Sequence, residues 1–420
     1  MNPWITTWQA FLHDHPSLDV VPPRDYPAVP AVPPAALARD ESFWAGVKAQ
    51  FPGHPGLINL NSGAVSTGPH AVEKAFVAYY QLLNQLPSYY TFKYMEGGRE
   101  LIREGLAGLL NAEAGEVATL RNTTEALNNV IFGVPLRAGD EVVACKQDYS
   151  KAVASWKQRA LRENITVRWV NLEGPAETDA EIVAKYVAAF TDRTRLLHLT
   201  HVINWNGQVL PVAALTREAK KRGIEVLLDG AHSFGLLETD VKALGCDYFV
   251  TALHKWLSGP IPSALLYVER SKIPALWPLA SSLTPQSDNI RKFEELSIQL
   301  MPALLGLGYA IEFNDWLGRA NKEARLRHLR RYWTAQLADL DGLYFRTPLD
   351  EDRCCVIVNV AVPGRAPAEL EKELFDAHRV HVQAIVWENM PGIRVTPNVY
   401  TSPAELDRLV AGLKRITNYE

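Results

Sequence analysis

From about residue 116 onward, the sequence alternates between short hydrophobic runs and segments with the periodicity of amphipathic helices. Runs rich in valine, leucine and isoleucine are typical of strands that are buried on both faces of a sheet. The predicted strands lie at residues 117–120, 140–144, 166–170, 195–202 and 224–229 and within 245–257. Their alternation with helices predicts an α/β fold, in which helices cover both faces of a mostly parallel sheet.

Two of these strands end in side chains that can serve one kind of site. The strand at 224–229 ends in Asp229, and the run at 245–257 delivers Lys255 to a loop. A lysine amine can hold an aldehyde cofactor as a Schiff base, and an aspartate can keep a pyridine nitrogen protonated. Either residue alone would be ordinary in an α/β protein. The pair indicates a pyridoxal 5'-phosphate (PLP) site only together with further motifs.

A candidate phosphate site follows the strand at 117–120. Thr123 and Thr124 stand where a helix is predicted to begin. The free amides and the dipole of a helix N-terminus attract an anion, and two hydroxyl groups add donors. Capping of the helix by a threonine is the alternative explanation.

The composition favours an enzyme that acts on a small molecule. The chain has 420 residues, 47% of them hydrophobic, and a net charge of −4. Acidic and basic residues are well mixed, so we expect no nucleic-acid partner, and no window has the length of a membrane-spanning helix. Four cysteines without metal-site or disulfide spacing predict no metal and a cytoplasmic location. The first eight residues lack the regions of a signal peptide.

The motifs Asp229-Gly230-Ala231-His232 and His254-Lys255-Trp256 resemble those of the class V aminotransferase family of PLP-dependent enzymes, most closely its isopenicillin N epimerase-like branch. The similarity runs from about residue 57 to the C-terminus. It implies the PLP-dependent transferase fold of type I. In that fold, a large domain holds a sheet of the seven-stranded type between helices, and a small α+β domain follows at the C-terminus.

Three parts of the chain are therefore expected, namely an N-terminal arm (1–55), a large PLP-binding domain (56–300) and a small domain (301–420). Prolines keep much of the arm extended. Tryptophans in the arm indicate that its short helices dock either on the arm's own subunit or on a partner subunit.

The resemblance assigns the chemistry to Lys255 and Asp229, and it implies further contacts to the cofactor. The implied cofactor-binding residues are Thr123, Thr124 and His254 at the phosphate, Tyr149 stacked on the ring, Asn204 at the phenolic oxygen, His232 beside the ring oxygen or the phosphate, and Thr251 as a hydroxyl donor. For His232 a buried structural histidine is the alternative, and Asn204 alone would be read as a turn residue.

The resemblance also implies a substrate side of the site. Arg394 would bind the α-carboxylate of the substrate, because a guanidinium group can bind a carboxylate through two parallel hydrogen bonds. The loop Asn61-Ser62-Gly63 would lie close to the substrate, and a plain connection between a strand and a helix is the alternative. Two positions depart from the family pattern. Ala252 replaces a serine, and Ile298 replaces a threonine that reaches the cofactor phosphate of the partner subunit in a homodimer.

Residues 302–341 have a helical period, and four arginines there are expected on a solvated face. These arginines are Arg325, Arg327, Arg330 and Arg331. Cys354 and Cys355 are expected to begin a strand of the small domain.

The implied function is removal of the α-proton of an amino acid or an amino-acid-derived substrate bound to PLP. Epimerisation or racemisation is slightly favoured, while a β-eliminating C–S lyase and an aminotransferase are alternatives. A cysteine desulfurase is disfavoured, because residues 378–392 contain no cysteine. A PLP-binding protein without turnover is the alternative outside enzymes. A homodimer is expected.

Overall fold

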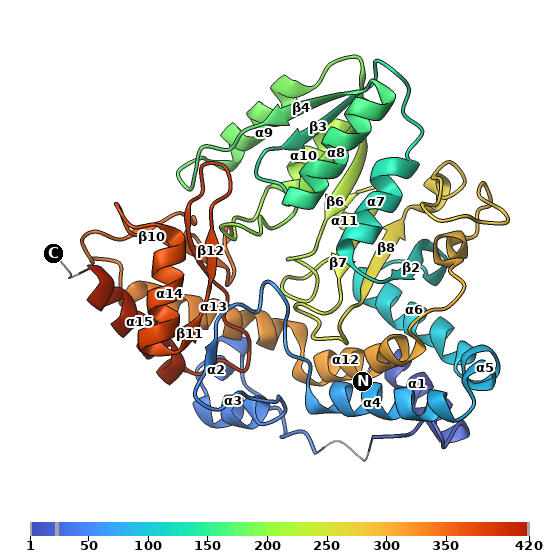
Figure 1. Ribbon diagram of the computed structural model, residues 1–420, viewed down its shortest axis with the longest axis horizontal. Coiled ribbons are helices and arrows are strands. Elements are labelled where there is room, and N and C mark those ends of the chain that lie inside the picture. The colour runs from blue at the N-terminus through green and yellow to red at the C-terminus, as the bar shows by residue number, and fades with distance from the viewer. Residues whose placement is uncertain (1, 22–24, 418–420) are drawn as a thin grey trace.

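A seven-stranded sheet forms the centre of the larger part of the molecule (Figure 1). The computed structural model describes residues 2–21 and 25–417. In spatial order the strands are β2 (Val117–Leu120), β8 (Ala264–Val268), β7 (Tyr248–Ala252), β6 (Glu225–Asp229), β5 (Thr194–Thr200), β3 (Glu141–Cys145) and β4 (Thr166–Val170). β8 runs antiparallel to both of its neighbours, and the other ladders are parallel. The predicted α/β fold is confirmed.

Alternate side chains of the central strands enter two separate hydrophobic cores. Val142 and Leu227 pack with α7 and α8 on one face, whereas Val143 and Leu228 pack with α9 and α10 on the other. The helices that follow the strands are α7 (Thr123–Gly133), α8 (Ser150–Glu163), α9 (Asp179–Ala189), α10 (Val212–Lys220) and α11 (Val241–Leu244). Because both faces are covered, the central strands are nearly continuous hydrophobic runs.

Three long helices form a layer beside the sheet, at the bottom of Figure 1. They are α4 (His70–Gln85), α6 (Glu96–Leu110) and α12 (Met301–Leu317). The shorter helical segments of the large part are α5 (Pro87–Tyr89), η1 (Tyr90–Tyr94), η2 (Ala114–Glu116), η3 (Arg270–Lys272) and η4 (Ile290–Glu294). α12 packs against α4 and α6 and is buried all round from Met301 to Asn314. We propose that α12 bridges the large domain and the small domain expected from residue 301 onward.

The N-terminal arm packs on its own chain, one of the two arrangements that the sequence left open. Its helices are α1 (Pro3–Asp14), α2 (Pro34–Leu37) and α3 (Glu41–Lys48), and residues 22–24 of the predicted arm lie outside the described part. The rings of Trp4 and Trp8 stack 5.9 Å apart. A Cβ atom at Gly105 of α6 would lie 2.5 Å from Trp4, and one at Gly308 of α12 would lie 2.4 Å from Trp8. The two glycines therefore make room for the arm.

The small part contains an antiparallel four-stranded sheet with helices against it. The spatial order is β12 (Gln383–Ile385), β13 (Gly392–Val395), β10 (Val358–Ala361) and β9 (Tyr344–Phe345). The helices are α13 (Arg319–Ala335), α14 (Pro367–His378) and α15 (Pro403–Thr417). The expectation that Cys354 and Cys355 begin a strand was wrong, since β10 begins only at Val358. Both cysteines are buried in the segment before it.

The predicted helix at 302–341 is broken, and two of its arginines are buried. Gly318 has a φ of +79° and separates α12 from α13. Arg325 is 1% exposed and donates to Glu41 of the arm at 2.9 Å, while the Nη2 atom of Arg330, also 1% exposed, lies 2.6 Å from Glu351. The prediction of a solvated arginine face was therefore wrong for these two side chains, because distant carboxylates compensate their charges.

The segment that leads into the large part, at residues 58–63, is hydrogen-bonded to the small part. β1 (Ile58–Asn59) pairs in parallel with β11 (Val380–His381). Thr396, just after β13, donates its backbone amide to Leu60 at 2.7 Å and accepts the amide of Gly63 on its hydroxyl at 2.9 Å. The loop that follows β1 is therefore anchored to the sheet of the small part.

No helix within residues 2–21 and 25–417 is long and apolar enough to cross a membrane. Over the same residues, no group of three or more histidine, cysteine, aspartate or glutamate side chains is placed to hold a metal ion.

Candidate active site

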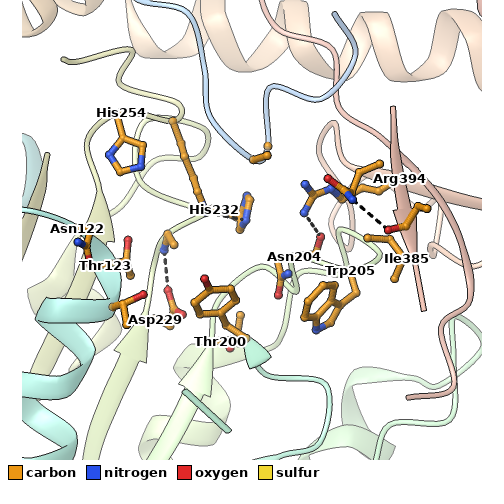
Figure 2. Close-up of a pocket in the computed structure, with 18 residues that line it drawn as sticks. Asn122, Thr123, Thr200, Asn204, Trp205, Asp229, His232, His254, Ile385 and Arg394 are labelled. Atoms are coloured by element: carbon orange, nitrogen blue, oxygen red, sulfur yellow. Dashed lines mark hydrogen bonds between the residues drawn. The ribbon is translucent and has the colours of Figure 1, made fainter. Parts of the chain in front are cut away.

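A cavity of about 350 Å³ lies at the carboxyl ends of the parallel strands, where side chains of the small sheet face those of the large sheet (Figure 2). Ligands of open α/β sheets bind at this edge. The cavity is lined by Gly63, Ala64, Asn122, Thr123, Thr124, Tyr149, Thr200, Asn204, Trp205, Asp229, Ala231, His232, His254, Lys255, Gln383, Ala384, Ile385 and Arg394. Most of the residues singled out in the sequence are thus brought together here.

Asp229 is the last residue of β6 and is buried at the floor of the cavity. Its Oδ1 accepts the backbone amide of Ala231 at 2.9 Å, which is the only hydrogen bond of this carboxyl group within the described chain. Burial raises the pKa of Asp229 above the ordinary value, although the charges of His198 and Lys255 act in the opposite direction. A buried carboxylate with so little compensation favours a cationic ligand beside it.

Lys255 follows β7 and projects its amine into the same cavity. Burial lowers the pKa of this amine to about 8. Its Nζ lies 3.1 Å from Nε2 of His232, while Nδ1 of His232 accepts the indole N–H of Trp256 at 3.3 Å. Because an indole can only donate, the proton of the neutral imidazole resides on Nε2 and points at the lysine. The histidine thus presents a donor to the uncharged amine, which is the nucleophilic form of a lysine and becomes the main form above about pH 8.

The N-terminus of α7, a candidate anion site, lies at the other end of the cavity (Figure 2). The side chain of Asn122 caps this helix by accepting the amide of Glu125 at 2.9 Å. Thr123 and Thr124 line the cavity and begin the helix, so its dipole adds to their donors. Nδ1 of His254 is held by the backbone of Ser263, which leaves Nε2 for a ligand.

Thr251 does not reach the cavity. Its hydroxyl is fully buried and donates to the carbonyl oxygen of Gly230 at 3.0 Å. Side chains alternate between the two faces of a strand, and those of β7 pack in the cores on both sides of the sheet. The structure therefore does not place Thr251 where it could replace the serine that Ala252 lacks.

Arg394 of β13 is a buried guanidinium group without an acidic partner among the residues described. Its Nη1 donates to the carbonyl oxygen of Asn204 at 2.9 Å, and its Nη2 donates to Oδ1 of Asn61 at 3.1 Å. Burial lowers its pKa to about 10, so it keeps its charge at neutral pH. Nε has no partner in the described chain. The group is thus oriented by two acceptors and still requires an anion.

The loop after β1 reaches the cavity through Gly63 rather than Ser62. The hydroxyl of Ser62 is fully buried and lies 2.9 Å from that of Tyr400. Asn61 does not line the cavity, but it accepts a hydrogen bond from Arg394 and donates one to Gln383, and both of these residues line it. Of the three predicted residues, Gly63 therefore lines the cavity, Asn61 positions Arg394, and Ser62 points away.

Several residues that line the cavity were not predicted from the sequence. Thr200 ends β5 next to Asp229 and donates its hydroxyl to Oδ1 of Asp148 at 2.7 Å. Burial raises the pKa of Asp148 to about 7. The position of Thr200 at a strand end was a usable signal. The other lining residues not predicted are Ala64, Asn122, Trp205, Ala231, Gln383, Ala384 and Ile385. Gln383, Ala384 and Ile385 belong to β12 of the small sheet, and no local sequence pattern predicts that they line this cavity.

The chemistry of the cavity fits PLP. It combines a lysine amine of lowered pKa, an undercompensated carboxylate for a protonated pyridine nitrogen, and a helix N-terminus with hydroxyl groups for a phosphate. Oδ1 of buried Asn204 has no partner in the described chain, so this amide can still bind a ligand. Fold and cavity together define a PLP-dependent enzyme of fold type I.

Comparison with known proteins gives the family. The model of the class V aminotransferases matches residues 58–392. The chain belongs to this family, as the sequence motifs had indicated.

Two curated relatives and one solved structure illustrate the range of chemistry in similar proteins. The isopenicillin N epimerase of Streptomyces clavuligerus is 28% identical over 393 residues, which cover 89% of this chain and 98% of the relative. The cysteine desulfurase of Pectobacterium atrosepticum is 29% identical over 409 residues, covering 88% and 97%. The cystine C–S lyase C-DES, solved with its reaction product cysteine persulfide, has a TM-score of 0.79 at 23% identity, covering 87% and 99%.

Proposed function

We propose that the protein epimerises or racemises an amino acid, or a substrate derived from one, by moving its α-proton. One observation carries the proposal: the lowered-pKa amine of Lys255, the carboxylate of Asp229 and the unpaired guanidinium of Arg394 share one cavity. Arg394 binds the α-carboxylate, and Lys255 takes the α-proton as general base. His232 donates from Nε2 and holds the amine in place.

The other lining residues hold the cofactor. Bound PLP supplies an electron sink for the charge left at the α-carbon. Asp229 would pair with the pyridine nitrogen, and its own raised pKa would fall with that cation beside it. Thr123, Thr124 and His254 would hold the phosphate. Tyr149 would stack on the ring, and the amide of Asn204 would hydrogen-bond the phenolic oxygen. None of these contacts needs a metal ion.

The cysteines argue against desulfurase chemistry in this chain, although cysteine desulfurases are among its relatives. All four are buried, and none lines the cavity. Burial raises the pKa of Cys246 and Cys354 to about 12, and it raises the pKa of Cys145 and Cys355 further. A sulfur acceptor must be an accessible thiolate. The similarity to isopenicillin N epimerases then favours epimerisation over β-elimination and transamination.

The test is incubation of the PLP-loaded protein with a panel of amino acids, sulfoxides and short peptides in deuterated water. Proton NMR follows loss of the α-proton signal, chiral chromatography follows inversion, and pyruvate and keto acids are assayed together. Inverted, deuterated substrate is the expected result. Pyruvate would identify a lyase instead, and a keto acid would identify an aminotransferase. Lys255→Ala is the control that should exchange no α-proton.

We further propose that the protein is a homodimer. Large apolar side chains are exposed on α4, η1 and the loops at residues 65, 261 and 298. They include Val65, Val77, Tyr80, Phe92, Ile261 and Ile298, which are 43–69% exposed. Burial of such a surface would favour association. Light scattering coupled to size exclusion should give twice the mass of the chain, and Val77→Glu should lower it. A monomer at micromolar concentration would contradict the proposal.

A reducing, cytoplasmic location is proposed from the same cysteines. They are unpaired and buried within the described chain, so the fold has no need of disulfide formation. Fractionation of cells that produce the tagged protein should recover it with cytoplasmic markers.

A further inference from the structure

Trp205 is held in a fixed orientation in the wall of the cavity. Its ring stacks on that of Trp387, with 5.4 Å between centroids and 22° between planes. Its Nε1 donates to the carbonyl oxygen of Asp148 at 3.3 Å, and the indole of Trp387 donates to the carbonyl oxygen of Lys146 at 2.9 Å. Each indole is thus fixed by the other and by a backbone acceptor. The apolar surface of Trp205 is in place before a ligand arrives.

The wall around Trp205 is otherwise apolar or neutral. Ile385 and Ala384 of β12 line the same region, together with the amide of Gln383. Figure 2 shows Trp205 beside Ile385, with Arg394 directly above both. A substrate whose carboxylate is bound by Arg394 therefore has its side chain next to an indole and an isoleucine.

A second charge on the substrate would have no partner in this region. The labelled ionisable groups Asp229 and His254 lie toward the opposite side of the cavity in Figure 2, and His232 lies in the middle. Arg394 is occupied when it binds the α-carboxylate. Burial of an unpaired charge is costly, whereas an apolar side chain gains from contact with the indole.

We propose that Trp205 selects substrates with an uncharged aromatic or bulky apolar side chain. This inference rests on the proposed function, because it requires that Arg394 bind the α-carboxylate. It adds the substrate class and the residue that determines it. Similarity to relatives did not indicate this preference, since it depends on Trp205, Trp387 and β12 of this chain.

The first experiment compares α-proton exchange of L-phenylalanine, L-leucine, L-alanine, L-aspartate and L-lysine on the PLP-loaded protein. We expect kcat/KM for phenylalanine and leucine to exceed that for alanine by at least about tenfold, with aspartate and lysine lower still. If lysine or aspartate reacted fastest of the five, the inference would be overturned, while the proposed function would still stand. No exchange with any of the five amino acids would also overturn the inference, and the proposed function would be contradicted only if the sulfoxides and peptides of the wider panel exchanged no α-proton either.

The second experiment tests the residue. Trp205→Ala should reduce the ratio of kcat/KM for phenylalanine over alanine by about tenfold, and Trp205→Phe should retain most of the preference. The exposed Trp277, which does not line the cavity, supplies the control Trp277→Ala with an unchanged ratio. Titration of the cofactor absorbance with phenylalanine gives Kd for each variant without turnover and confirms that the site is loaded. An unchanged Kd and ratio in Trp205→Ala would overturn the assignment.

Discussion

At the scale of single residues, the amine of Lys255 is the group whose protonation sets the behaviour of the site. Its pKa is lowered to about 8 by burial. Only the neutral amine attacks an aldehyde, so capture of PLP by the cofactor-free protein should accelerate as pH rises and level off above about pH 8. Stopped-flow absorbance measures this rate. A rate that keeps rising to pH 10 would mean that the amine has the ordinary pKa of a lysine.

Arg394 gives a second prediction at this scale. Arg394→Lys keeps the positive charge but removes the pair of parallel donors. Hydrogen bonds to charged groups contribute about 1.5–3 kcal/mol, so kcat/KM for an amino acid should fall about 10–100-fold, mainly through KM. Arg331→Lys, at an exposed position of α13, is the matched control and should have no effect. An unaffected KM in Arg394→Lys would remove this arginine from carboxylate binding.

The sequence predicts which residue types stand at strand ends more reliably than it predicts the direction in which their side chains point. Asp229 and Lys255 were predicted and share the cavity, because the carboxyl ends of parallel strands converge at one edge. Arg394 was also predicted, and it reaches the cavity from β13 of the small antiparallel sheet. Thr251 does not line the cavity, because the direction of its side chain depends on its position in the alternation along β7. Trp205 was missed because its place is set by Trp387, a partner from a distant segment of the chain.

At the scale of elements, the alternation of strands and helices followed local signals, whereas one helix boundary and the buried faces of the helices did not. The break at Gly318 was not recognised, and the exposure expected for Arg325 was wrong because Glu41 of the arm packs over it. A 3.6-residue period shows which residues share a face. It cannot show which distant segment covers that face.

The docking of the arm gives a prediction at this scale. Gly308→Ala places a Cβ atom 2.4 Å from the ring of Trp8, and overpacking of this kind costs about 1–3 kcal/mol. We expect a lower Tm and faster cleavage of the arm by protease. Gly108→Ala on α6 has open space around it and should raise stability by about 0.5–1 kcal/mol. Equal effects of the two substitutions would show that the arm does not pack as described.

At the scale of the whole molecule, the cavity joins the two sheets, so its ligand should stabilise both parts together. A ligand that binds only the folded state adds about 2.7 kcal/mol at one hundred times its Kd. Removal of PLP should therefore lower Tm, and added PLP should restore it in a concentration-dependent way. Pyridoxal, which lacks the phosphate, should raise Tm less than PLP does, because it leaves the N-terminus of α7 without an anion. A Tm that is independent of PLP over a hundredfold range would contradict this view of the cavity.

The pairing of β1 with β11, and the bonds from Thr396 to Leu60 and Gly63, have a mechanical consequence. Arg394 lies on β13, two residues before Thr396, which directly follows this strand, and Asn61 accepts a hydrogen bond from its guanidinium group. If the small sheet rotates against the large one, this loop and the arginine travel as one rigid unit. Such a rotation would widen the entrance to the cavity, while Asn61 still orients the guanidinium group of Arg394 that binds the incoming carboxylate.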